Sequence, residues 1–266
     1  MATGIVYGPI SEMYHRFRPR YGDDPYDLIR ARARMFEHAV DLGAGTGHVT
    51  RDLLSIFTHV TAIEPDSDMA RFLPENRRLT IHLVRAENAV VATASSDAVV
   101  SGSAFHWMDA NVVSRLARSW LKPSGFFFVF GVPSTPGSLH IEPEQALDPI
   151  RAEALKWEAY KSKPVLNWVP YVERVKSTKV FAVTEPWQGN IVARWTPLEM
   201  AGYFLSSSFA SLYARSQSEI SDYLELLTER IVGAVGDEVI EARFTLEGAI
   251  GYSGPAQEYW ASTASF

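Results

Sequence analysis

The fold class of this chain is indicated most clearly by residues 39–47, Ala39-Val40-Asp41-Leu42-Gly43-Ala44-Gly45-Thr46-Gly47. Ala39 and Val40 form the apolar run of a buried strand, and a helix-like stretch follows from Thr46 to Phe57. A strand that turns through glycines into a helix start offers backbone N–H groups and room for the polar end of a ligand. The pattern therefore predicts a ligand site at the end of the first strand of an α/β sheet.

Two acidic residues limit the kind of ligand. Asp41 stands two residues before the first glycine, where a carboxylate repels a phosphate but tolerates a cationic ammonium or sulfonium group. Glu64 ends the next expected strand, and an acid at that point of a doubly wound fold lies beside a ligand's ribose. The plainer interpretation of Glu64 is a solvated acid before a turn proline. NAD stays open as a rival ligand, although His48 stands where the dinucleotide motif wants a small residue.

The composition excludes several classes of protein. The chain has 266 residues, 47% of them hydrophobic, which is enough for one sizeable α/β domain. Its formal charge of −6, with no Lys/Arg tract, disfavours a nucleic acid or an anionic membrane as partner. With no cysteine there is no disulfide and no thiolate metal site. We find no signal-peptide pattern and no membrane-length apolar run, so a cytoplasmic protein is expected.

Strand-like and helix-like segments alternate along the first half of the chain. Strands are expected at residues 38–43, 60–63, 81–84, 98–100 and 126–130, and helices at 23–35, 46–57, 66–73 and 109–120. This alternation implies right-handed crossovers and a parallel sheet. The fold class is therefore α/β.

The second half is richer in aromatic residues and less regular. Helices are expected at 143–162, 197–213 and 219–235, with strands at 180–183 and 241–252, the last antiparallel at the sheet edge. We expect this half to form a helical cap over the ligand site. The whole chain, residues 1–266, is interpreted as one domain, with residues 36–131 as its core and residues 1–35 and 132–235 contributing the cap.

Several segments together resemble a known family. They are Val40 to Gly47, Ile63-Glu64-Pro65, Ala86-Glu87, Phe105-His106-Trp107-Met108-Asp109, Leu121-Lys122-Pro123-Ser124-Gly125, an N-terminal Tyr14…Arg18-Pro19…Tyr21, and Trp195-Thr196-Pro197 with the later Gly202-Tyr203. The chain resembles class I S-adenosylmethionine-dependent methyltransferases, in particular the small-molecule group that includes trans-aconitate methyltransferase. The resemblance implies a Rossmann-like doubly wound seven-stranded sheet, in the order 3-2-1-4-5-7-6 with an antiparallel last strand, and S-adenosylmethionine as cofactor.

The resemblance also implies roles for individual residues. The glycine turn would lie under the methionine portion, and Glu64 would bind the ribose. Ala86-Glu87 would border the adenine, and Gly102-Ser103 would line the methionine and sulfonium. Arg18 would be a candidate for the cofactor's carboxylate. The group often has a glutamine where Ser103 stands. The cofactor-binding residues implied in this way are Tyr14, Arg18, Asp41, Gly43, Ala44, Gly45, Glu64, Pro65, Ala86, Glu87, Gly102 and Ser103.

His106 follows the fourth expected strand, where a ligand crevice is expected, and is the candidate catalytic base. A histidine that packs on Trp107 and bonds the backbone is the alternative, and Trp107 itself suits a core as well as a substrate platform. Aromatic residues near a sulfonium contribute cation–π attraction and suit an apolar acceptor. The candidate substrate-binding residues are Trp107, Trp168, Tyr171, Tyr203 and Ser207.

The leading hypothesis is a methyltransferase acting on a small molecule, with an acceptor oxygen favoured and a carboxylate preferred through the trans-aconitate resemblance. Two alternatives stay open: cyclisation, cleavage or rearrangement chemistry with the same cofactor, and a non-catalytic cofactor-binding protein. No catechol-type cluster of oxygen ligands is visible, so no metal is expected. We expect a monomer or a homodimer.

Overall fold

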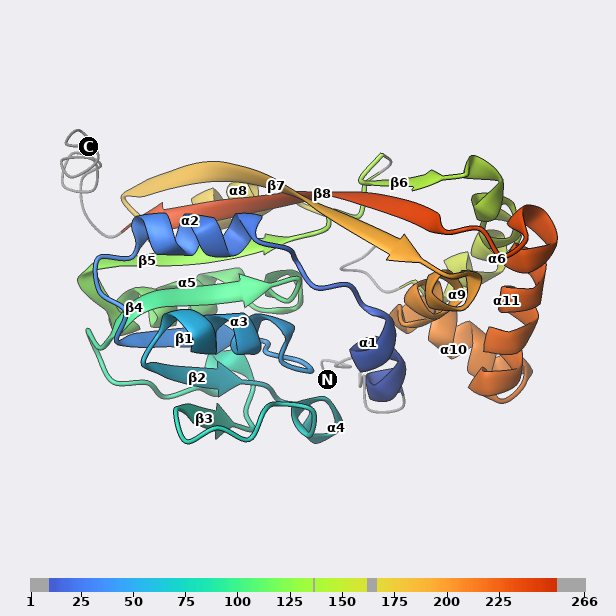
Figure 1. Cartoon of the computed structure of the whole chain (residues 1–266). Coiled ribbons are helices and arrows are strands. Elements are labelled where there is room, and N and C mark those ends of the chain that lie inside the picture. Colours follow the sequence, from blue (N-terminus) through green and yellow to red (C-terminus); the bar gives the residue numbers. More distant parts are fainter. Residues whose placement is uncertain (1–9, 136, 162–166, 253–266) are drawn as a thin grey trace. The chain divides into compact units, whose positions relative to one another are not determined.

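The computed structural model describes residues 10–135, 137–161 and 167–252, which divide into two compact units (Figure 1). Of the described residues, unit 1 takes 10–20, 134–135, 137–161, 167 and 190–245, and unit 2 takes 21–133, 168–189 and 246–252. The long strands β7 (Val183–Trp195) and β8 (Ile240–Tyr252) each belong partly to both units. The expectation of a single domain stays a prediction.

Unit 2 contains a parallel sheet in the order β3-β2-β1-β4-β5, with β8 antiparallel beside β5 and β7 paired with β8. The parallel strands are β1 (His38–Leu42), β2 (His59–Ile63), β3 (Leu79–His82), β4 (Ser96–Gly102) and β5 (Leu121–Gly131). The predicted Rossmann-like fold, with an antiparallel last strand beside β5, is thereby confirmed, but the sheet formed by the described residues has eight strands and not the seven predicted. In unit 1, the short strand β6 (Leu139–Glu142) pairs with residues 241–244 of β8 and adds to the predicted strands.

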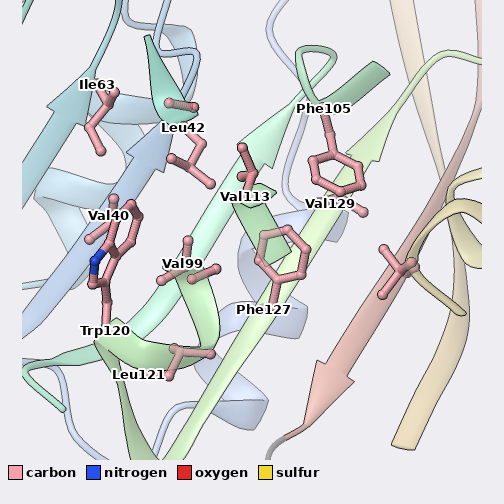
Figure 2. Packing of buried hydrophobic residues seen from close by; sticks show 14 of the residues in the cluster. Val40, Leu42, Ile63, Val99, Phe105, Val113, Trp120, Leu121, Phe127 and Val129 are labelled. Atoms are coloured by element: carbon pink, nitrogen blue, oxygen red, sulfur yellow. The ribbon is translucent and has the colours of Figure 1, made fainter. Parts of the chain in front are cut away.

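The parallel strands read as apolar runs because helices cover both faces of the sheet. Val40, Val99 and Phe127 are partners in adjacent strands and are fully buried in one hydrophobic cluster, as Figure 2 shows. Phe126, Phe128 and Phe130 alternate with them and face the other side, since successive strand residues point to opposite faces. The core of unit 2 therefore lies on both sides of the sheet.

Four helices cover these faces. Residues of α5 (Ala110–Trp120) and α8 (Tyr171–Ser177) belong to the cluster of Figure 2, whereas α2 (Asp24–Arg32) packs on α3 (His48–Ile56) on the other side of the strands (Figure 1). Short helical segments α4 (Ser67–Ala70), η2 (Ala86–Asn88) and η3 (Phe105–Trp107) follow β2, β3 and β4. They place their residues at the carboxyl ends of the strands, where ligands bind in open α/β sheets.

Unit 1 is largely helical. Its helices are α1 (Ser11–Phe17), α6 (Leu147–Trp157), α9 (Pro197–Leu205), α10 (Ser208–Gln217) and α11 (Ile220–Val235), with short η4 (Glu144–Ala146) and η5 (Glu158–Tyr160). Gly202 lets α1 pack on α9, because a Cβ there would overlap the Phe17 ring. The buried Glu153 accepts hydrogen bonds from Tyr223, Lys156 and Arg230, and so ties α6 to α11.

Several predicted elements differ in their bounds. The strand expected at 180–183 is β7, which begins at Val183 and continues to Trp195. The helix expected at 197–213 is two helices, because Ser206 and Ser207 donate side-chain hydrogen bonds to the carbonyls of Tyr203 and Phe204 and end α9 there. The helix expected at 143–162 comprises η4, α6 and η5, and its predicted end at Ser162 lies outside the described residues. Within those residues, no helix has the length and apolar character to cross a bilayer.

Candidate functional site

The glycine turn after β1 has the backbone that only glycine adopts without strain. Gly43, Gly45 and Gly47 have φ values of 69°, 56° and 86°. A Cβ on Gly43 would overlap the Cβ of Ala104 and lie 3.0 Å from Cε of Met108. The turn is therefore packed directly against the segment that follows β4.

The backbone N–H groups of this turn are bonded within the protein. Gly43 and Ala44 donate to the carbonyl of Ile63 at 2.8 and 3.1 Å, and Gly47 donates to Ala44 at 2.9 Å. Gly45 donates to Oε2 of Glu64 at 2.8 Å. The expectation that the turn offers these four N–H groups to a ligand was wrong, because the carbonyls of Ile63 and Ala44 and the carboxylate of Glu64 accept them. A turn whose donors are already paired gives little support to a dinucleotide pyrophosphate.

Asp41 is a fully buried acid at the end of β1. Its Oδ2 accepts a 2.6 Å hydrogen bond from the hydroxyl of Thr50, in the first turn of α3, whereas Oδ1 has no hydrogen-bond partner among the described residues. Burial raises the pKa of Asp41 to about 7; the Thr50 bond opposes this rise, and the nearby Glu64 adds to it. A buried carboxylate with one orphaned oxygen fits a cationic ligand group, since burying an unpaired charge is costly.

Glu64 follows β2 and holds the turn from its other side. Oε2 accepts from Gly45, and Oε1 accepts a 2.9 Å bond from the N–H of Asp66. Burial raises the pKa of this carboxyl, while the two N–H donors act in the opposite direction. Each carboxylate oxygen has a second lone pair, so Glu64 can still accept from ribose hydroxyls. Pro65 beside it is exposed.

The residues predicted beside the adenine follow β3, and those predicted beside the sulfonium lie at the end of β4; β2 and β1 separate these two strands in the sheet. Ala86 is buried in the cluster of Figure 2, and Oε1 of Glu87 accepts a 3.0 Å bond from the N–H of Asp109. A Cβ on Gly102 would lie 2.6 Å from Cγ2 of Val49, so α3 closes on this point. Ser103 has a left-handed φ of 51°, an uncommon backbone for a residue with a side chain. Their cofactor contacts stay predictions.

His106 lies in η3 among aromatic rings. Its Nδ1 is 3.2 Å from the hydroxyl of Tyr171, and its ring centroid is 4.8 Å from that of Trp107 and 5.3 Å from that of Trp168. Burial lowers the pKa of His106 to about 4, and the Arg174 guanidinium adds to the lowering. The imidazole is therefore neutral near pH 7, with a free lone pair for a proton, but the lowered pKa makes it a weaker base than an ordinary histidine. The structure thus groups four predicted catalytic or substrate residues in unit 2.

Four other predicted residues belong to unit 1. The Arg18 guanidinium lies over the rings of Tyr14 and Tyr203, 5.2 and 4.9 Å from their centroids. Its Nε donates a 2.8 Å bond to the hydroxyl of Ser206. The hydroxyl of Ser207 donates to the carbonyl of Phe204, as in a helix end. Their predicted roles in cofactor and substrate binding stay predictions.

Three residues of the site were missed from the sequence. Thr50 bonds Asp41, Glu247 in β8 accepts from the N–H of Tyr171 at 3.2 Å, and Arg174 bonds the carbonyls of His106 and Met108 at 3.3 and 3.0 Å. The one available signal was Glu247, an acid inside an apolar strand. No group of three or more metal-ligating side chains occurs in the part of the chain that the structure describes.

Part of this chain is similar in sequence to known proteins. Residues 40–129 match the family described as a methyltransferase domain. An uncharacterised methyltransferase of Mycobacterium bovis is 35% identical over 124 residues, which are 46% of this chain and 49% of the relative. The chain thus spans about half the length of the curated relatives it matches.

Two solved structures share the fold. A protein described as a type II methyltransferase from Anaeromyxobacter dehalogenans has a TM-score of 0.68 at 20% identity, over 90% of this chain and 99% of that one. The phosphoethanolamine N-methyltransferase 2 of Haemonchus contortus, solved with S-adenosylhomocysteine, has a TM-score of 0.50 at 14% identity, over 92% of this chain and 57% of that one. The fold is therefore the Rossmann-like fold of S-adenosylmethionine-dependent methyltransferases.

Proposed function

We propose that this chain is an S-adenosylmethionine-dependent methyltransferase that acts on a small molecule at oxygen. The observation that carries the proposal is the pair of acids around the glycine turn. Asp41 is buried with one unpartnered oxygen, and Glu64 bonds the turn while keeping acceptor capacity. Both belong to the segment, 40–129, that matches the methyltransferase-domain family.

The residues around the turn fit this cofactor. The ammonium of its methionine portion would pair with the orphaned Oδ1 of Asp41, because opposite charges attract strongly at a buried position. Glu64 would accept from the ribose hydroxyls. A Cβ on Gly45 would meet Cε of Met69 at 3.5 Å and the carbonyl of Gly43 at 4.0 Å, so this glycine leaves the turn open to a ligand, whereas Ala104 fills that place at Gly43. When bound, S-adenosylmethionine supplies an electrophilic methyl carbon on a sulfonium.

The protein's part in methyl transfer is alignment, exclusion of water and removal of a proton from the acceptor. His106 is our candidate for the proton acceptor, because its neutral imidazole lies at the end of β4 among aromatic side chains. The resemblance to the trans-aconitate group favours a carboxylate acceptor, which needs no base. A hydroxyl acceptor is the choice that uses His106.

Titration calorimetry with S-adenosylhomocysteine tests the cofactor directly. We expect micromolar affinity for this compound and no heat with NAD at 1 mM. Mass spectrometry of the protein with S-adenosylmethionine alone is the companion measurement, for which we expect an unchanged cofactor. No binding of S-adenosylhomocysteine would refute the proposal, and a new product formed without an acceptor would favour cyclisation or cleavage chemistry instead.

A further inference from the structure

The first residue of α8 reaches the candidate base. Tyr171 is buried, with 1% of its surface exposed, and its hydroxyl is 3.2 Å from Nδ1 of His106. Trp168 packs against both rings, at 5.2 Å from Tyr171 and 5.3 Å from His106 between centroids. These contacts hold the imidazole in one place and present one of its two nitrogens to the tyrosine.

The position of Tyr171 is set by the end of β5 and by β8. The N–H of Tyr171 belongs to the first turn of a helix and has no partner within it, so Oε1 of Glu247 accepts it at 3.2 Å. A carboxylate also suits this end of a helix electrostatically. Glu247 stands opposite Gly131 in the β5–β8 register, and a Cβ on Gly131 would lie 3.1 Å from the Tyr171 hydroxyl. The same Cβ would lie 2.6 Å from Oγ and 3.0 Å from Cα of Ser103, so the missing side chain of Gly131 makes room for Ser103 as well as for the Tyr171 hydroxyl.

A neutral histidine carries one ring proton, and the partner of one nitrogen decides which nitrogen stays free to act as a base. In many sites the nitrogen that faces a fixed oxygen keeps the proton and donates it, which orients the ring. Tyr171 supplies such an oxygen from a rigid helix start. The low pKa of His106 means that this choice of tautomer persists over the whole range near neutrality.

We propose that Tyr171 is a positioning residue, whose hydroxyl accepts a hydrogen bond from Nδ1–H of His106 and so leaves Nε2 as the proton acceptor for a hydroxyl substrate. The catalytic half of this inference rests on the proposed methyl transfer. In that step Nε2 takes the proton of the acceptor hydroxyl while the hydroxyl oxygen bonds the methyl carbon of S-adenosylmethionine. The electron pair of the broken carbon–sulfur bond stays on sulfur. A substrate that needs an oriented His106 is a hydroxyl compound such as a phenol, because an ionised carboxylate has no proton to remove.

Side-chain ¹⁵N NMR of the histidines at pH 7.5 tests the pair without any turnover, with His106 assigned by the signal missing in His106→Gln. In the wild-type chain we expect His106 protonated at Nδ1. In Tyr171→Phe, which keeps the ring, we expect the ratio of Nδ1-protonated to Nε2-protonated forms to fall roughly five- to tenfold, as the loss of one neutral hydrogen bond implies.

Tyr160→Phe is the matched control, because it loses a comparable 3.3 Å contact with the hydroxyl of Ser216 in unit 1. It should leave the His106 signals unchanged. A wild-type His106 protonated at Nε2, or an unchanged tautomer in Tyr171→Phe, would overturn the inference. Calorimetry with S-adenosylhomocysteine on the same samples judges the proposed function separately, since the tautomer result does not depend on cofactor binding.

Discussion

The buried carboxyl of Asp41 lowers the stability of the folded protein near neutral pH. An acid with an ordinary pKa near 3.9 in the unfolded chain and about 7 when folded holds its proton more tightly in the folded state. Folding therefore loses stability as the pH rises from about 4 to about 7, and the full cost, up to about 4 kcal/mol, applies above that range. Such a cost at a ligand site is typical of a residue kept for function.

Asp41→Asn removes this pH-dependent cost. The amide oxygen can still accept the hydrogen bond from Thr50, so the comparison isolates the charge. Between pH 5 and pH 8 we expect the stability of the variant relative to wild type to improve by about 2–3 kcal/mol. Thermal unfolding at the two pH values measures it. An equal difference in stability at both pH values would contradict the raised pKa of Asp41.

At the residue scale, the sequence identified the acids and glycines of the site but missed some of their partners. Asp41, Gly45 and Glu64 were predictable because they lie close to a glycine motif that has local geometric requirements. The contact of His106 with Tyr171 joins residues 65 positions apart, and the contact of Tyr171 with Glu247 spans 76. Pairs so distant in sequence follow from the packing of whole elements, which local patterns do not encode.

The turn between β1 and α3 is the element on which the cofactor proposal depends. In Gly43→Ala, the added Cβ overlaps the Cβ of Ala104, and the alanine has to adopt the positive φ of Gly43. Both Cβ atoms are fixed to the backbone, so neither can move without shifting the end of a strand. We expect a loss of roughly 2–4 kcal/mol of stability, combining strain with overpacking, and loss of S-adenosylhomocysteine binding. Urea unfolding and calorimetry are the measurements.

Gly233→Ala is the control for that variant. Gly233 lies inside α11, and nothing stands within 4 Å of its would-be Cβ, so alanine should stabilise the helix by about 0.5–1 kcal/mol. Binding should be unchanged. If Gly43→Ala behaved like this control, the turn would not have the tight packing described above.

Regular elements with a strong apolar period were predictable, and weak or interrupted ones were not. The helix expected at 109–120 is α5, and the strand expected at 241–252 is β8, because both have a continuous buried face. β7 was placed too early and too short, since Pro186, Gly189 and exposed polar residues hide its strand pattern. The apolar period alone predicts one continuous helix over residues 197–213, whereas Ser206 and Ser207 separate α9 from α10.

At the scale of the whole molecule, the chain crosses between the two units five times, and β7 and β8 are shared. Units connected in this way are expected to unfold together. In Glu153→Ala, Tyr223, Lys156 and Arg230 of unit 1 lose a common buried partner, at a cost of roughly 2–4 kcal/mol. We expect one urea transition, shifted to lower urea, with tryptophan fluorescence and far-UV circular dichroism coinciding. Two separated transitions would show that the units unfold independently.

The cofactor proposal requires the buried carboxylate of Asp41 to pair with the ammonium of an adenosyl amino-acid ligand. The most direct test is the affinity for S-adenosylhomocysteine at pH 6 and pH 8 in wild type and Asp41→Asn. Because the pKa of Asp41 is about 7, the wild-type affinity should rise about tenfold between these pH values. The variant should bind more weakly at pH 8 and show no such rise. Equal, pH-independent affinity in both proteins would contradict the account.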